Sequence, residues 1–161
     1  MLNPKETLLS TLKRNNSTTH DEIKDITHAE SLTQPPYNVN CLNWVLGHIL
    51  TSRDSCLRLL HLPTLLSDAE RQVYGHGSVP LTDPQTAVDF DALVEKLDCS
   101  FEQLAPALLA LSAEALEADT AFFGPNRSLF DWLAFFQWHE AYHIGQLDLL
   151  RQMSGKNDKI I

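Results

Sequence analysis

Residues 128–153 read SLFDWLAFFQWHEAYHIGQLDLLRQM, and this stretch decides the fold of the chain. On an α-helix, where each residue advances by about 100°, its apolar side chains gather in one sector. Ser128 followed by Asp131 resembles a capping box, and Gly155 is a suitable left-handed residue beyond the last turn. The stretch therefore predicts a long amphipathic helix. The sector contains Leu129, Trp132, Phe136, His139, His143, Leu147 and Leu150.

A second amphipathic helix is predicted from residue 40 to about residue 61. Arg53 and Asp54 fall outside its main apolar stripe. Pro63 should end the helix, because proline lacks a backbone donor. The following segment to Pro80 is expected to be a long connection over one end of the molecule. The stripe consists of Leu42, Val45, Leu46, Ile49, Cys56, Leu57 and Leu60.

The other predicted elements are less regular. A first helix is expected from residue 2 to about residue 32, broken or weakened at residues 15–19, NNSTT, where helix propensity is low. Thr82-Asp83-Pro84 predicts the start of a third helix that runs to about residue 111. Pro106 lies inside this span and should either kink the helix or break it in two. Residues 124–126 mark a turn, and no convincing strand is predicted.

Length and composition favour a single domain over residues 1–161. A chain of 161 residues with 43% hydrophobic and 20% charged residues is typical of a globular protein that buries its own core. All predicted elements are helices, so the expected fold class is all-α. Cys41, Cys56 and Cys99 are odd in number and lack C-x-x-C spacing, so we expect free thiols rather than disulfides or a zinc-thiolate site.

The charge balance limits the possible partners. The chain has 12 basic and 21 acidic residues and a formal net charge of −9, so nucleic acid is not an expected partner. No apolar stretch approaches the roughly 20 residues needed to cross a bilayer, and no signal peptide is evident at the start. We therefore expect a cytoplasmic protein without a membrane partner.

His139 and His143 are the first candidate functional residues. Their spacing of four places the two rings one turn apart, at about 5–6 Å between Cβ atoms, so that both can reach a common point. Neutral imidazoles on a buried face can each offer a lone pair to a cation. The alternative is a pair of core histidines that are hydrogen-bonded to neighbours such as Glu140 or Gln146.

His48, on the second predicted helix, is the candidate third ligand. Gly47 beside it would permit a close approach of another helix. On the helical wheel His48 lies off the centre of the apolar stripe, so an ordinary flank histidine is the alternative. Cys41 is expected to be a small apolar filler about 10 Å away along the helix, too far for an easy shared metal. The other histidines are predicted to be solvated; they are His20, His28, His61 and His76.

Aromatic residues follow the same helix as the histidine pair. Phe136 is predicted to be a core residue, because aromatic residues at helical spacing usually are. Trp138 lies off the main stripe and is the better candidate for a pocket wall or a subunit contact.

Two short segments, NWVLGH at residues 43–48 and HEAYHIGQL at residues 139–147, resemble the signature segments of the DinB-like superfamily. The resemblance extends over nearly the whole chain. It implies a four-helix bundle of the up-down-down-up type with a long crossover connection, often dimeric. It also implies a solvent-open site in which His48, His139 and His143 bind a divalent metal, zinc or nickel. Arg151 matches a basic residue often found in such sequences, whereas Ile144 stands where some relatives have arginine.

The resemblance implies a metal-dependent enzyme, because the superfamily includes thiol-dependent transferases and isomerases and proteins described as metal-dependent hydrolases. Three protein ligands leave a coordination position for water or substrate. The expected partners are a small-molecule substrate or low-molecular-weight thiol and a second copy of the chain. Glu140 could orient a ligand, act as a base or be a solvated acid, and Gln146 could hydrogen-bond an outer group, so no catalytic residue is assigned.

Two other interpretations of the histidines remain. One is a non-catalytic metal- or ligand-binding module related to stress. The other is a bundle in which the histidines only fill space. Imidazole ligands accept several metals, so the sequence fixes neither the physiological metal nor the substrate.

Overall fold

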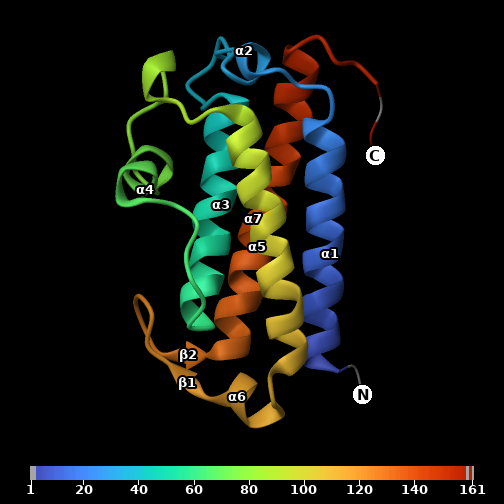
Figure 1. Cartoon of the computed structure of the whole chain (residues 1–161), viewed down its shortest axis with the longest axis vertical. Coiled ribbons are helices and arrows are strands. Elements are labelled where there is room, and N and C mark those ends of the chain that lie inside the picture. Colours follow the sequence, from blue (N-terminus) through green and yellow to red (C-terminus); the bar gives the residue numbers. More distant parts are fainter. Residues whose placement is uncertain (1–2, 159, 161) are drawn as a thin grey trace.

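The computed structural model describes residues 3–158 and 160, and this part of the chain is mainly helical (Figure 1). The four longest helices lie side by side. In the ring that they form, α1 and α3 each pack against both α5 and α7. The predicted all-α class is therefore confirmed. The four helices are α1 (Pro4–Ile23), α3 (Leu42–Leu59), α5 (Phe90–Ala110) and α7 (Leu129–Met153).

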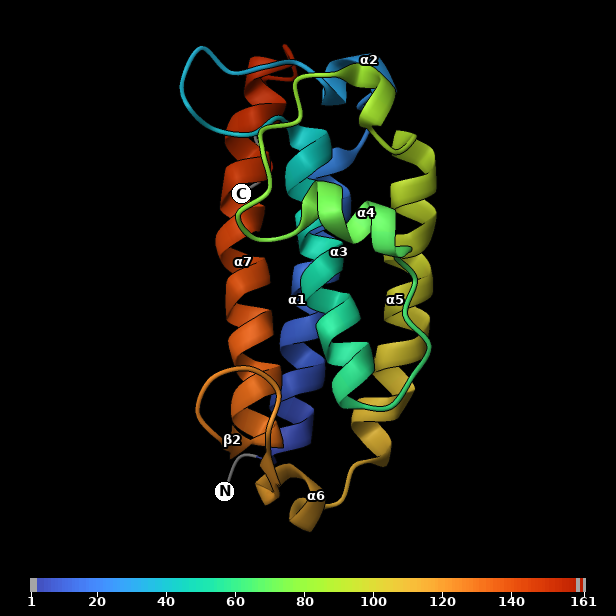
Figure 2. The ribbon, with the colours of Figure 1, turned by 90° about the vertical axis from the view of Figure 1, so that its left-hand side faces the viewer.

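The connection between α3 and α5 crosses the length of the molecule. In Figures 1 and 2, α1 and α7 run in one direction along the long axis, and α3 and α5 run in the other. Because α3 and α5 run the same way, residues 60–89 must return the chain to the end where α3 began. This segment contains α4 (Asp68–Tyr74) and the 3-10 helix η1 (Pro84–Thr86). The connection was predicted to lie over one end of the molecule, and this was wrong, because the segment runs along the bundle and includes the helix α4.

A capping box stabilises the start of α4. The Ser67 side chain accepts from the Glu70 backbone N–H at 3.3 Å, and the Glu70 carboxylate accepts from the Ser67 N–H at 2.6 Å. These bonds satisfy backbone donors that a helix of seven residues would otherwise leave to solvent.

The remaining elements are short. They are α2 (His28–Ser31), α6 (Ala113–Glu117), and two antiparallel strands, β1 (Asp119–Thr120) and β2 (Arg127–Ser128). The expectation of no strand was therefore wrong. Each strand has two residues, too few to produce an alternating pattern in the sequence. Gly124 turns the hairpin between them with φ of 75°.

The predicted weakness at residues 15–19 does not occur, because α1 continues through them to Ile23. Asn15 is buried, and its side-chain amide donates to the Gln137 carbonyl of α7 at 2.9 Å. Thr19 is buried too, and its hydroxyl donates to the Asn15 carbonyl at 2.8 Å. Tertiary contacts thus override low propensity. The chain breaks instead after α1, where Asp25 adopts φ of 57°.

The third long helix begins later than predicted. Asp83 and Pro84 start only η1, after which the backbone is extended again at Ala87. α5 begins at Phe90, where the Asp89 side chain accepts from the backbone N–H groups of residues 91 and 92. Pro106 lies within α5 and does not break it, so the helix continues to Ala110. The fourth helix and its Ser128 cap agree with the prediction.

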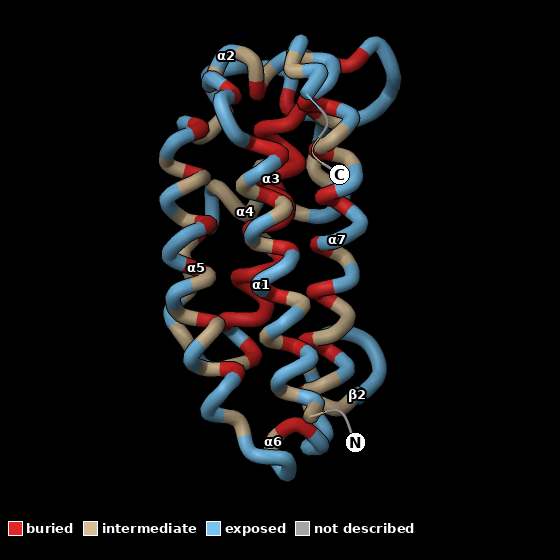
Figure 3. Tube along the Cα trace, turned by 90° about the vertical axis from the view of Figure 1, so that its right-hand side faces the viewer, coloured by how far each residue is buried: buried red, intermediate tan, exposed pale blue. Residues whose placement is uncertain are grey.

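The buried residues line the inward faces of the long helices (Figure 3). α3 is buried around most of its circumference, because the segment with α4 covers the side that the other long helices leave open. Arg53 and Asp54 lie outside the apolar stripe, yet each is only 1% exposed. Asp54 accepts from the backbone N–H groups of Leu65 and Leu66, at 2.9 and 3.1 Å, and so ties the crossover to α3.

None of the helices in the described part of the chain is long and apolar enough to cross a membrane. The cytoplasmic location stays a prediction.

Candidate metal centre

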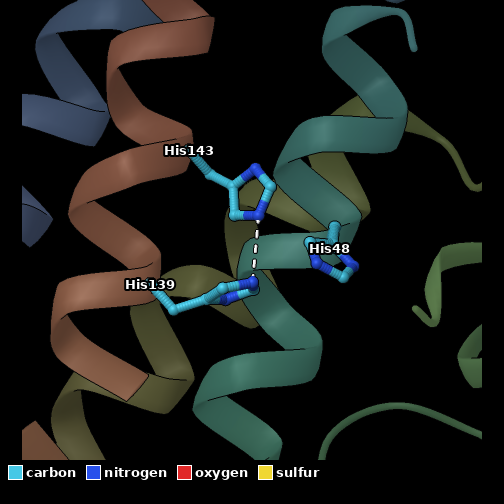
Figure 4. Close-up of side chains that lie close together, drawn as sticks. All are labelled: His48, His139 and His143. Carbon is cyan, nitrogen blue, oxygen red and sulfur yellow. Dashed lines mark hydrogen bonds between the residues drawn. The ribbon is translucent and has the colours of Figure 1, made fainter. Parts of the chain in front are cut away.

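Three histidines meet between α3 and α7 (Figure 4). His139 and His143 project from α7 toward α3, which contributes His48. One ring nitrogen of each residue lies within 4.8 Å of the others. The closest pair is Nε2 of His139 and Nε2 of His143, at 3.2 Å. His48 and His143 are buried and His139 is partly exposed, so the cluster is reachable from solvent on one side.

Each ring is also held at its other nitrogen. Nδ1 of His48 donates to the backbone carbonyl of Tyr74 at 2.7 Å, and Nδ1 of His143 donates to Oε1 of Gln146 at 2.7 Å. A carbonyl oxygen can only accept, so the proton of these two neutral rings is on Nδ1 and the lone pair is on Nε2. Nδ1 of His139 lies 2.9 Å from the Ser52 hydroxyl, which can accept in the same way.

This hydrogen-bonding pattern turns the Nε2 lone pairs toward a common space. Figure 4 marks the Nε2 atoms of His139 and His143, 3.2 Å apart, as hydrogen-bonded, which requires a proton on one of them unless a cation lies between them. The separation is close to the roughly 3.3 Å expected between two nitrogens on a tetrahedral zinc ion with ~2.0–2.1 Å bonds. Outer hydrogen bonds that fix the imidazole tautomer are also usual at metal sites. The donor set therefore fits a divalent metal.

The protonation state fits as well. Burial lowers the pKa of all three histidines below their usual value of 6.5. The pKa of His139 falls to about 4, first because of burial and then because His143 and His48 would repel its charge. Near neutral pH the three rings are thus neutral, which is the form that binds a metal.

Aromatic side chains fix the orientation of the rings. Trp44 stacks on His48 with the ring centroids 4.7 Å apart and an angle of 11° between the planes. The Trp44 indole N–H is shared between the Val73 carbonyl and the Ser78 hydroxyl, both at 3.0 Å. On α7, the Tyr142 ring lies edge-on to His143 at 5.2 Å. The cluster is therefore rigidly framed.

Tyr74 is a positioning residue that the sequence did not suggest. Its carbonyl holds His48, and its buried hydroxyl donates to the Asn43 side chain at 2.9 Å and accepts from the Val88 N–H at 2.8 Å. Gly47 makes this possible, because a Cβ there would lie only 2.3 Å from the Tyr74 ring. The predicted close approach at Gly47 is thus confirmed, with α4 as the neighbour. The Ser67-to-Glu70 capping pattern was the one sequence signal for this helix.

The sequence matches a known family over most of its length. A family model described as DinB superfamily matches residues 11–147. The chain belongs to the DinB superfamily. A crystal structure described as the conserved protein of locus from Enterococcus faecalis has a similar fold, with a TM-score of 0.73 and 18% sequence identity. The similarity covers 96% of this chain and 98% of that chain. No curated protein matches the sequence.

In this DinB-superfamily protein, Glu140 pairs with Arg53 rather than with the histidine cluster. Its carboxylate is buried and accepts from Nε and an Nη of Arg53 at 3.2 and 2.7 Å. Arg53 also donates to the Leu97 carbonyl and the Ser100 hydroxyl of α5. A further bond runs from Arg53 to the Asn16 side chain of α1 at 2.9 Å, so the pair joins all four long helices. By contrast, Gln146 occupies the predicted outer position beside His143.

Arg151 is the basic residue that the resemblance singled out. It is buried away from the histidine cluster. Its guanidinium donates to the carbonyls of Glu22 and Lys24 and to the carboxylate of Asp158. It fastens the end of α1 to α7 and to the C-terminal segment, which is a structural role. Cys41 is fully buried in the core, as predicted for an apolar filler.

The remaining histidines divide into two groups. His61 and His76 are exposed, as predicted. His20 and His28 are half-buried and bonded, so their description as solvated residues was wrong. His20 lies 2.9 Å from the Asp98 carboxylate, and Nδ1 of His28 accepts from the Phe90 N–H at the start of α5 at 3.2 Å. Their partners are over 60 residues away in sequence, which explains why local pattern missed them.

Two pockets flank the cluster. The apolar pocket, of about 790 Å³, adjoins His143 and Trp44 between α7 and the 37–40 loop. The arginine pocket, of about 570 Å³, adjoins His48 and His139 and contains Arg58 and Arg71. Phe136 is buried in the core, as predicted. Trp138 is 62% exposed and is not among the described residues that line either pocket, so its role as a wall of these pockets was predicted wrongly and the subunit contact stays a prediction. The three histidines thus stand where two cavities of different chemistry approach each other.

Proposed function

We propose that this DinB-superfamily protein binds one divalent metal ion, zinc or nickel, through Nε2 of His48, His139 and His143. The observation that carries the proposal is the pattern of hydrogen bonds at Nδ1, which leaves the Nε2 atoms of His48 and His143 unprotonated and turns them, with that of His139, toward one space. In the same proposal the four long helices form the up-down-down-up bundle of the superfamily, with the metal between its second and fourth helices.

We further propose that the protein is a metal-dependent enzyme of the thiol transferase or hydrolase type. Three protein ligands leave at least one coordination position, and a bound divalent metal would supply Lewis acidity that lowers the pKa of a coordinated water or thiol. The chain's own residues prepare this position. Tyr74, Ser52 and Gln146 hold the rings, and the partial exposure of His139 leaves a small molecule access from the flanking pockets.

A second candidate is a non-catalytic metal- or ligand-binding module. It is favoured by the absence of Asp and Glu among the described residues that line the two flanking pockets. Glu140, the acid adjacent to a ligand in sequence, is already occupied by Arg53. The described lining of the two pockets therefore offers no carboxylate as a general base. An enzyme would rely on the metal and on histidine or tyrosine side chains for proton transfer.

Turnover measurements separate the two candidates. Zinc-loaded, nickel-loaded and chelator-treated protein would be assayed with activated esters and with an electrophile plus low-molecular-weight thiols. Enzyme function predicts consumption that depends on the metal and is lost in His139→Ala, with His61→Ala as the exposed-histidine control. Stoichiometric metal without turnover in any assay would favour the binding module.

A further inference from the structure

The arginine pocket is lined by basic side chains, although the chain as a whole is acidic. The chain has 21 acidic residues against 12 basic ones, yet no acidic residue is among the described residues that line this pocket. Its lining combines two arginines, hydroxyl groups and phenylalanine rings with His48, His76 and His139. The apolar pocket on the other side of the cluster has neither lysine nor arginine in its described lining. Arginine side chains are therefore confined to the His48 and His139 side of the cluster.

The two arginines are not equivalent. Arg71 is already neutralised, with its guanidinium 3.1 Å from the Asp54 carboxylate and 2.7 Å from that of Asp68. Arg58 has no carboxylate within ion-pair distance in the described part of the chain. It donates to the Ser55 hydroxyl at 3.2 Å, and its guanidinium lies 5.3 Å from the centre of the Phe122 ring. These contacts orient Arg58 and leave most of its five N–H donors free.

The distance between Arg58 and the histidine cluster limits the length of a ligand that could contact both. His48, Ser52 and Ser55 follow one face of α3 at helical spacing, and Arg58 reaches back to Ser55. Ser55 is seven residues beyond His48, which corresponds to about 10 Å along the helix. Between these two ends α3 contributes the hydroxyl groups of Ser52 and Ser55, and the lining also includes the rings of Phe123 and Phe135. The pocket therefore offers a cation at one end, the histidine cluster at the other, and both hydroxyl groups and phenylalanine rings in its lining.

From this arrangement we infer that the arginine pocket binds a small-molecule carboxylate. Its carboxylate pairs with Arg58, its apolar body lies against the phenylalanine wall, and its opposite end reaches the metal held by the three histidines. A planar guanidinium with free donors is suited to two-point recognition of a carboxylate. The inference rests on the proposed metal site and adds the substrate class to it.

The test uses two probes that differ only at the end distant from the metal. Both are eight-carbon hydroxamates, which bind metals, and one ends in a carboxylate where the other ends in a carboxamide. Their affinities for zinc-loaded protein would be measured by calorimetry. We expect the carboxylate to bind about tenfold more tightly at low salt, and this preference to shrink as salt rises.

Variants locate the preference. Arg58→Gln should remove the preference for the carboxylate and leave carboxamide binding unchanged, with the fold checked by circular dichroism. Arg14→Gln is the matched control, since it removes the same charge from an exposed position of α1 outside the pocket. Equal binding of both probes, or a preference that persists in Arg58→Gln, would overturn the inference alone. Failure of both probes to bind protein that carries one zinc per chain would overturn the inference and leave the metal site standing, whereas protein that takes up no zinc would overturn the metal site and the inference with it.

Discussion

The backbone carbonyl of Tyr74 accepts a hydrogen bond from Nδ1 of His48 at 2.7 Å. This bond links α4, in the middle of the crossover, to the candidate metal ligand on α3. It fixes both the tautomer and the direction of the His48 ring. Any change that moves α4 should therefore act on metal affinity from a distance.

Gly47→Ala tests this link. A Cβ at residue 47 would lie 2.3 Å from the Tyr74 ring, so α4 must move and the bond to His48 must lengthen. We expect metal affinity to fall by about 10–100-fold, as for other outer-sphere changes, and stability to fall by about 1–3 kcal/mol from overpacking. Zinc titration and urea unfolding measure the two effects.

Gly145→Ala on α7 is the matched control for this substitution. No atom lies within 4 Å of its added Cβ, so metal affinity should stay the same and stability should not fall. Equal metal affinity in both alanine variants would show that Tyr74 does not position His48.

The sequence predicted α3 and α7 well because their signals are local. Apolar periodicity and the Ser128 cap placed α7 within one residue of its observed bounds. On the helical wheel, His48 lay off the centre of the single apolar stripe that was considered. In the structure α4 covers the other side of α3, so His48 is buried as well. Tyr74 was missed for the same reason, since it meets His48 from 26 residues away in sequence. The cluster of three histidines was thus predictable from the sequence, as was Gln146 beside His143, whereas the support that Tyr74 supplies from the crossover was not.

The buried pair of Arg53 and Glu140 should be important for stability. Arg53→Met would leave the Glu140 carboxylate buried without its cation, and we expect a loss of about 3–5 kcal/mol. The double variant Arg53→Met, Glu140→Leu should recover most of this loss, because no lone charge then remains buried. Urea unfolding of the three proteins forms the comparison.

Metal content provides the second part of this test. Every folded variant of the Arg53 and Glu140 pair should bind as much zinc as the original protein, since neither residue contacts the histidines in the described structure. A stable Glu140→Gln variant with reduced zinc would instead assign Glu140 to the metal site.

Glu22 should make stability depend on pH. It is fully buried and neither carboxylate oxygen has a hydrogen-bond partner in the described structure. Burial, and then the charge of Asp148, raises the pKa of Glu22 above its usual value of 4.5, against a smaller opposite effect of Arg151. The folded protein thus holds this proton more tightly than the unfolded chain, so the contribution of Glu22 to stability decreases as pH rises above about 4.5.

Glu22→Gln should consequently stabilise the protein by on the order of 1 kcal/mol at pH 7 and by little below pH ~4. Glu30→Gln is the control of opposite sign, because hydrogen bonds from Thr27 lower the pKa of Glu30. Urea unfolding across this pH range gives the difference curves. A Glu22→Gln difference that is constant with pH would contradict the prediction.

We also predict a homodimer through the exposed face of α7. Trp138, Tyr142 and Leu149 are each more than half exposed and follow one another by four and seven residues, a spacing typical of a helix-packing seam. Light scattering at micromolar concentration should give twice the monomer mass for the original protein and the monomer mass for Trp138→Glu. Val79→Glu, at an exposed apolar residue outside α7, should stay dimeric. A monomer mass for the original protein would contradict the prediction.

We predict that the three histidines of α3 and α7 form one metal site, and the metal content per chain measures this. Mass spectrometry of tag-free protein after zinc loading and desalting should give one metal per chain. His48→Ala, His139→Ala and His143→Ala should each lose most of it while circular dichroism stays helical, and His61→Ala and His76→Ala should keep it. Full occupancy in His48→Ala would remove α3 from the site, and full occupancy in both His139→Ala and His143→Ala would contradict the site altogether.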